Sequence, residues 1–79
     1  MHLEIVTPEK SLYSGEVELV QLPGKNGSFE ILKNHAPIVS SLEKGTIKIK
    51  SVGGEEIFFE INGGVAECKK NVISVLADN

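Results

Sequence analysis

The sequence predicts an all-β domain, and three observations carry that prediction. Apolar and polar residues alternate along most of the chain, which is typical of strands with one buried face. Glycine, asparagine and proline turn signals separate the alternating segments at fairly regular intervals. No window of about ten or more residues has the spacing of an amphipathic helix. Short strands with frequent turns point to an antiparallel sandwich or barrel.

The N-terminal half contains three segments with strand periodicity. Leu3 and Ile5 flank Glu4, which predicts a first strand. Val17 and Leu19 alternate with glutamates over residues 16–19, and this pattern continues to position 22. Phe29 and Ile31 alternate with polar residues over 28–31. The turn signals beside these segments are Ser14-Gly15, Pro23-Gly24 and Asn26-Gly27.

Three more segments with strand character follow in the C-terminal half. Residues 46–50 and 56–61 alternate, although Phe58 makes the second segment apolar on both faces. Residues 72–76 form a short, β-branched segment. Gly53-Gly54 and Lys70-Asn71 each suit a tight hairpin, because such turns need residues that tolerate positive φ. Further turn signals are Lys44-Gly45 and Asn62-Gly63-Gly64.

Length and charge limit the classes of function. A chain of 79 residues corresponds to one small domain, so we expect a single domain over 1–79. The formal net charge is −3, and all eight basic residues are lysine. Nucleic-acid binders usually carry a positive surplus and use arginine for bidentate contacts. We therefore expect neither a nucleic acid nor an anionic membrane surface as partner.

Further expectations follow from cysteine use and from the apolar runs. A lone cysteine, Cys68, has no internal partner for a disulfide, which favours a reducing compartment. Residues 1–6 lack the basic and apolar regions of a signal peptide. No apolar run approaches the ~20 residues of a membrane span, so we expect no direct membrane insertion.

The residues that could support catalysis or metal binding are scattered. A triad would need His2 or His35 together with Asp78, which is the only aspartate, and no acyl-transfer motif surrounds them. The two histidines and Cys68 have no metal-ligand spacing. Residues 23–28 faintly resemble a phosphate loop, but a strand follows where that motif needs a helix. We expect no enzyme, no cofactor and no metal.

Two features of the sequence have an ordinary structural interpretation and also a functional alternative. Lys48 and Lys50 share one face of a predicted strand, where they suit a solvated face that discourages edge pairing. The alternative is a small β carrier domain with a modified lysine, although such domains present that lysine at a hairpin tip. Asn34-His35-Ala36-Pro37 predicts a rigid corner, because proline forces the preceding residue toward extended geometry. The alternative there is an exposed functional loop.

Several segments stand in a specific order along the whole chain. They are Leu3–Pro8, Leu12–Val17, Val20–Leu32, Asn34–Pro37, Leu42–Ile47, Gly63–Val65 and Val75–Asp78. In this order and at this spacing, the sequence resembles the epsilon subunit of bacterial and chloroplast F-type ATP synthases, which is called delta in mitochondria. The segment Asn34–Pro37 matches that family's Gly-His-Ala-Pro signature, and Leu42–Ile47 matches its Leu-x-x-Gly step.

The resemblance has three departures. Asn34 stands where glycine is usual, and asparagine tolerates the same left-handed backbone. Glu30 stands where the family often has glycine, so it adds a charge at the rotor-contact edge. The family's chains continue into a helical hairpin after the segment matched by Val75–Asp78. Since this chain stops at Asn79, by a short gene or by truncation, we expect neither hairpin inhibition nor nucleotide binding by that route.

The resemblance implies a fold and a role. The fold is a flattened antiparallel β-sandwich of about ten short strands. The role is that of a non-catalytic rotor subunit in the central stalk, which links the gamma subunit to the c-ring and transmits torque for ATP synthesis driven by protons or sodium ions. The implied location is peripheral, on the cytoplasmic face of the bacterial inner membrane, as part of the synthase.

The resemblance also implies two sets of interface residues. The gamma-facing set is Thr7 and Ser40. The c-ring-facing set is Lys25, Asn26, Gly27, Ser28 and His35.

Overall fold

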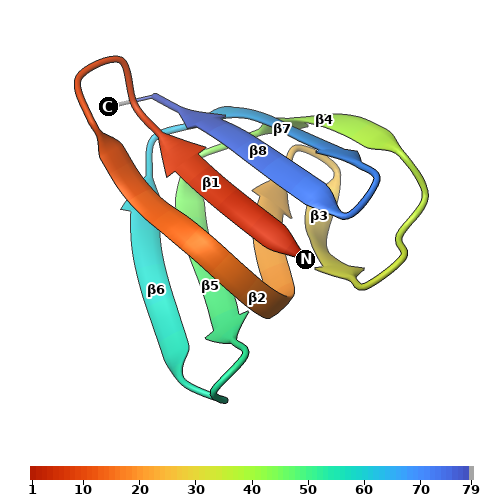
Figure 1. Ribbon diagram of the computed structural model, residues 1–79. Helices are drawn as coiled ribbons and strands as arrows, with labels where there is room; N and C mark the ends of the chain where they lie inside the picture. Colours follow the sequence, from red (N-terminus) through yellow and green to blue (C-terminus); the bar gives the residue numbers. More distant parts are fainter. Residues whose placement is uncertain (79) are drawn as a thin grey trace.

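A computed structural model describes residues 1–78, and every regular element in that part of the chain is a β-strand (Figure 1). The predicted all-β class is therefore confirmed. Asn79, the last residue of the predicted domain, lies outside the described residues. The eight strands are β1 (His2–Val6), β2 (Ser11–Gly24), β3 (Gly27–Leu32), β4 (Ile38–Leu42), β5 (Gly45–Ser51), β6 (Glu56–Ile61), β7 (Gly64–Lys69) and β8 (Val72–Ala77).

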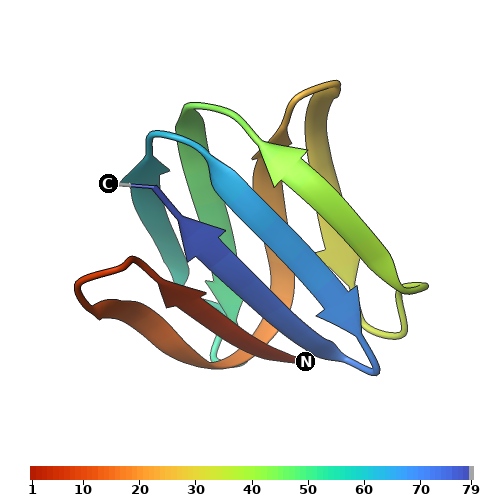
Figure 2. The ribbon, with the colours of Figure 1, turned by 90° about the horizontal axis from the view of Figure 1, so that it is seen from above.

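One sheet folds over on itself into two layers (Figures 1 and 2). Strands β1, β8, β7 and β4 lie side by side in one layer. The other layer holds β6, β5, the second half of β2, and β3. The molecule measures 27 × 23 × 18 Å along its principal axes, so it is the flattened body that a two-layer sandwich produces.

Strand β2 belongs to both layers. It is 14 residues long. Residues 11–16 pair with β1, whereas the part from Val17 onward pairs with β5 and β3. The described residues form eight strands where the resemblance implied about ten, and the unbroken course of β2 through the bend accounts for only one strand of that difference. Every pairing is antiparallel except that of β1 with β8, which is parallel.

The bend in β2 corrects one detail of the predicted pattern. Simple alternation placed Val17 and Leu19 on the same face, but the register shifts between them where β2 meets β5. Such an irregularity changes which side chains face the core. As a result Val20 is fully buried, and Leu19 is only half-buried on the outer side.

Of the two predicted tight hairpins, the one at Lys70-Asn71 forms as expected. Lys70 and Asn71 connect β7 directly to β8 with φ values of 52° and 62°. A two-residue hairpin of this kind needs positive φ at both positions, which gives the type I′ turn its twist. Gly53-Gly54 does not form a two-residue hairpin, because residues 52–55 connect β5 to β6 and only Gly54 of the pair has positive φ, at 88°.

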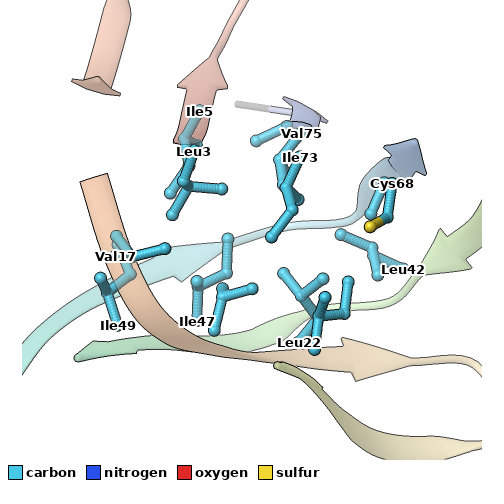
Figure 3. Close-up of a cluster of buried hydrophobic side chains, with 14 of the residues drawn as sticks. Leu3, Ile5, Val17, Leu22, Leu42, Ile47, Ile49, Cys68, Ile73 and Val75 are labelled. Atoms are coloured by element: carbon cyan, nitrogen blue, oxygen red, sulfur yellow. The ribbon is translucent and has the colours of Figure 1, made fainter. Parts of the chain in front are cut away.

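The core lies between the two layers and is entirely apolar in the described part of the chain (Figure 3). Leu3, Ile5, Ile73 and Val75 enter it from one layer, and Val17, Leu22, Ile47 and Ile49 from the other. Cys68 is also buried, as a small hydrophobe. The predicted inward positions of the first strand and of residues 46–50 are thus confirmed. No polar or charged side chain among the described residues is buried.

Candidate interaction surface

The turn between β2 and β3 gathers four of the residues expected to face the c-ring. Lys25, Asn26, Gly27 and Ser28 are all exposed there. The Lys25 backbone N–H donates to the Ser41 carbonyl oxygen at 3.3 Å, which ties the turn to the end of β4. The turn therefore projects as a defined polar tip from the sandwich.

His35 lies at the other end of β3 from this tip. Strand β3 spans six residues, so its two ends are about 17 Å apart at ~3.3 Å per residue. Within the described sheet β3 pairs only with β2, which makes it an edge strand. The residues predicted to face the ring therefore bracket the β3 edge and do not gather at one point. Glu30 lies between them on the same strand and is exposed.

The corner before His35 is tied to the β7–β8 hairpin. The Asn34 backbone N–H donates to Asn71 Oδ1 at 2.7 Å, and Asn71 Nδ2 donates to Asn34 Oδ1 at 3.1 Å. Asn34 adopts φ 66°, the left-handed conformation expected of the residue that replaces glycine in the family signature. The half-buried His35 places its Nδ1 at 2.7 Å from the Ala36 carbonyl oxygen. This loop is therefore the rigid corner that its sequence predicts.

Two substitutions of Asn71 separate the contribution of its hydrogen bonds to stability from that of its left-handed backbone. Asn71→Ala is expected to lower the free energy of unfolding by about 2 kcal/mol, because it removes two exposed hydrogen bonds and strains a left-handed residue. Asn71→Gly is expected to cost only about half as much, since glycine tolerates the backbone and loses only the hydrogen bonds. Urea unfolding of both variants measures the difference, and equal losses would contradict the role given to φ.

Thr7 and Ser40, the residues expected to face gamma, are in different surroundings. The Thr7 hydroxyl oxygen accepts from the backbone N–H groups of Glu9 and Lys10, and the hydroxyl donates to the Lys10 carbonyl oxygen. Thr7 thus stabilises the loop between β1 and β2. Ser40 lines a hollow beside the β2–β3 turn, together with Lys25 and Asn26. The structure therefore places Ser40 near the expected ring-facing tip and away from Thr7.

An exposed apolar band crosses the outer face of the layer that holds β4, β7 and β8. We define this apolar band as Val39, Val65 and Leu76, whose side chains are 70%, 43% and 61% exposed. Val65 and Leu76 are directly opposite on β7 and β8, and all three residues line one shallow hollow. Leu76 also lines a second hollow with Thr7 and Pro8. The band therefore extends from the β4 edge toward the β1–β2 loop.

Sequence reasoning missed this band, although a signal for it exists. On β7 the buried residues are Ala66 and Cys68, while the larger Val65 faces outward. On β8 the outward positions include Leu76, so that strand is apolar on both faces. Apolar residues on both sides of a strand in a small two-layer domain indicate that the outer face is covered by something else.

The two lysines considered for a carrier function lie within β5 and not at its tip. Lys48 Nζ is 3.3 Å from Glu56 Oε2 on the neighbouring strand β6. Beside it, the Thr46 hydroxyl donates to the Glu60 carboxylate. These cross-strand pairs support the interpretation of a solvated strand face.

The remaining candidates for chemistry do not converge. His2 Nδ1 is 3.1 Å from Glu16 Oε2, and His2 Nε2 is 3.7 Å from Glu4 Oε2, on an outward-facing stretch of β1 and β2. Within residues 1–78 no three His, Cys, Asp or Glu side chains are placed to hold a metal ion. The same residues contain no helix long and apolar enough to span a bilayer.

Burial of Cys68 is expected to make the folded chain less stable at alkaline pH. Desolvation raises the pKa of the Cys68 thiol above its ordinary value. As pH rises, the thiol ionises first in the unfolded chain, so the stabilising contribution present at neutral pH is lost above the ordinary thiol pKa. Urea unfolding is expected to show a loss of stability in this alkaline window that is smaller in Cys68→Ala. An identical pH dependence in both proteins would contradict this expectation.

Comparisons with known proteins cover the whole chain. The family model "ATP synthase, Delta/Epsilon chain, beta-sandwich domain" matches residues 1–79. The chain is 39% identical over 79 residues to the ATP synthase epsilon chain of Caulobacter vibrioides, and it spans 91% of that protein. It is 35% identical to the epsilon chains of Delftia acidovorans and Alkalilimnicola ehrlichii, but it spans only 56% of each.

Solved structures share the fold at lower sequence identity. A chain in the Euglena gracilis mitochondrial ATP synthase structure (OSCP/F1/c-ring) superposes with a TM-score of 0.86 and 19% identity, over 95% of this chain and 48% of that one. A chain in the Tetrahymena thermophila mitochondrial ATP synthase structure (central stalk/c-ring) gives a TM-score of 0.80 and 19% identity, over 100% of this chain and 63% of that one.

Proposed function

The chain belongs to the ATP synthase delta/epsilon chain beta-sandwich family, and on this premise we propose that it works as the epsilon subunit of a bacterial F-type synthase, linking gamma to the c-ring. The observation that carries the proposal is the family match along the entire chain. As part of this peripheral complex, the domain would sit at the cytoplasmic face of the inner membrane. It performs no chemistry of its own in this role.

We propose that the apolar band faces gamma. Exposed apolar patches rimmed by polar residues mark protein–protein contacts. Val39, Val65 and Leu76 form such a patch, and Glu67 and Ser74 line the same hollow. Thr7 lies near one end of the band, because it lines the adjoining hollow with Leu76. Ser40 follows Val39 on β4 but lies in the hollow beside the tip, so its contact with gamma stays a prediction.

We propose that the β3 edge faces the c-ring. The strand is bracketed by the polar tip Lys25–Ser28 at one end and by the His35 corner at the other. A contact along this edge explains why predicted ring-facing residues occur at both ends of one strand. Both ends are braced, the tip by the hydrogen bond from Lys25 to Ser41 and the corner by the two Asn34–Asn71 hydrogen bonds.

The fold suits the transmission of torque. The two layers are joined through one continuous strand, β2, which pairs with β1, β3, β4 and β5. A force applied at the β3 edge therefore reaches the layer that carries the apolar band through hydrogen-bonded strands. In this account the band and the β3 edge are the two ends of a mechanical connection.

Binding to a purified α₃β₃γ complex from the same source tests the proposal. The 79-residue chain is expected to co-elute one to one with the complex in size exclusion. Because its described residues include no helix, we expect ATP hydrolysis by the product to continue. The chain alone is expected to hydrolyse no ATP. A well-folded chain that fails to co-elute would overturn the proposal.

A further inference from the structure

Two Asn-Gly pairs occur in the chain, and the structure places their glycines in opposite environments: Gly27 is exposed and Gly63 is buried. Asn26-Gly27 lies at the β2–β3 turn, and Asn62-Gly63 lies in the connection from β6 to β7. Asparagine is a thermolabile residue. It is most reactive before glycine, because glycine has no Cβ to hinder the approach of its backbone nitrogen to the asparagine side chain.

The first pair has the freedom that this reaction needs. Asn26 and Gly27 are both exposed, and apart from Gly27 and its two chain neighbours no atom lies within 4 Å of the position that a Cβ on Gly27 would take. Among the described residues, the Asn26 side chain has no hydrogen-bond partner. Rearrangement of this two-residue turn is opposed by the Gly24–Gly27 pairing and the Lys25–Ser41 hydrogen bond, but the space beside Gly27 is open.

The second pair is held in place. Gly63 is buried, and its Cβ position lies 3.1 Å from Asp78 Oδ2 and 3.4 Å from the Leu42 carbonyl oxygen. The Gly63 carbonyl oxygen also accepts from the Asp78 backbone N–H at 2.9 Å. Movement of the Gly63 backbone toward the Asn62 side chain would break this hydrogen bond, which extends the pairing of β7 with β8.

The other described asparagines are restrained as well. Asn34 and Asn71 donate hydrogen bonds to each other, as described for the corner before His35. Each is followed by a bulky residue, His35 or Val72, whose side chain hinders attack by the backbone nitrogen. Asn26 is thus set apart from Asn34 and Asn71 by its following glycine and by the absence of a side-chain hydrogen bond, and from Asn62 by the open surroundings of that glycine.

We propose that Asn26 is a site of spontaneous deamidation in the folded chain. The Gly27 backbone nitrogen loses its proton and attacks Asn26 Cγ, a new N–C bond closes a succinimide ring, and the Cγ–Nδ2 bond breaks to release ammonia. Water then opens either carbonyl of the ring and yields aspartate or isoaspartate. The reaction needs no reactant except water, and it adds one negative charge at the tip.

The product changes the tip in two ways. A carboxylate next to Lys25 alters the charge of the polar surface that the proposed function assigns to the ring. Isoaspartate also adds a methylene to the backbone of a two-residue turn that closes the Gly24–Gly27 pair. The deamidation itself is a property of the isolated chain and does not depend on the proposed function.

Peptide mapping measures the two rates separately. The chain is incubated folded in mildly alkaline, heavy-oxygen water, then digested with trypsin in ordinary water. Peptide 26–33 reports on Asn26 and peptide 51–69 on Asn62. Heavy oxygen marks conversion that occurred in the folded chain, and isoaspartyl methyltransferase detects the isoaspartate product. Asn26→Gln and Asn62→Gln each remove one signal and serve as matched controls.

The expected result is conversion of Asn26 roughly ten times faster than that of Asn62, because Gly63 must first give up an ordered backbone. In denaturant the two rates are expected to converge, since both pairs have the same sequence. Equal rates in the folded chain, or faster conversion of Asn62, would overturn the proposal. Failure to bind gamma or the ring would leave this result unchanged.

Discussion

Gly64→Ala is expected to lower the free energy of unfolding by about 3 kcal/mol or more, through backbone strain and a backbone clash. Gly64 adopts φ 149°, which side-chain-bearing residues rarely adopt. A Cβ there would overlap the Leu76 carbonyl oxygen and lie 3.0 Å from Ala77 Cα. Both atoms belong to the backbone of the paired strand β8, so β7 and β8 must move apart.

Gly54→Ala is the matched control for this variant. Gly54 also has positive φ, at 88°, but nothing lies within 4 Å of its Cβ position. Only the strain remains, so a loss of about 1 kcal/mol is expected. Urea denaturation of the two variants gives both values. Because the whole domain is expected to have only about 4–12 kcal/mol of stability, Gly64→Ala should also reduce yield. Equal costs for the two variants would contradict the close packing described at Gly64.

Leu76→Glu is expected to weaken binding to gamma by at least about 30-fold, or about 2 kcal/mol. The substitution places a charge in the proposed apolar contact. Stability should change little, because Leu76 is 61% exposed in the free domain. Titration of the chain into α₃β₃γ measures the affinity, and urea denaturation checks the fold.

Phe58→Glu is the control on the opposite layer. Phe58 is 58% exposed, similar to Leu76, but it lies on the edge strand β6, away from the apolar band. The same change of an exposed apolar residue to glutamate is therefore expected to leave gamma binding within about twofold. If both variants lose affinity equally, or if only Phe58→Glu does, the assignment of the band to gamma is wrong.

Alternation predicted six strands because each of them carries branched or aromatic residues on its inner face. Strand β4 was not predicted, since the adjacent Ile38 and Val39 obscure its alternation. Strand β7 has small inward residues, Ala66 and Cys68, and only the family resemblance indicated it. The register shift after Val17 could not be predicted from periodicity either, because it depends on pairing with β5, a strand distant in sequence.

The positions of the proposed interface residues were partly predictable for the same physical reasons. The β2–β3 tip is local, so its turn signals placed Lys25–Ser28 together correctly. The position of His35 relative to that tip depends on the direction of β3. The apolar band depends on strands β4, β7 and β8 lying side by side. A surface assembled from distant strands becomes visible only when the sheet order is known.

Site-specific photo-crosslinking in the assembled synthase tests the central account most directly. A photoreactive residue replaces Leu76 on the band in one preparation and Asn26 at the tip in another. We expect the Leu76 position to link to gamma and the Asn26 position to link to subunit c. Links from the Leu76 position to subunit c, or from neither position to a rotor subunit, would contradict the proposed orientation of the domain between gamma and the ring.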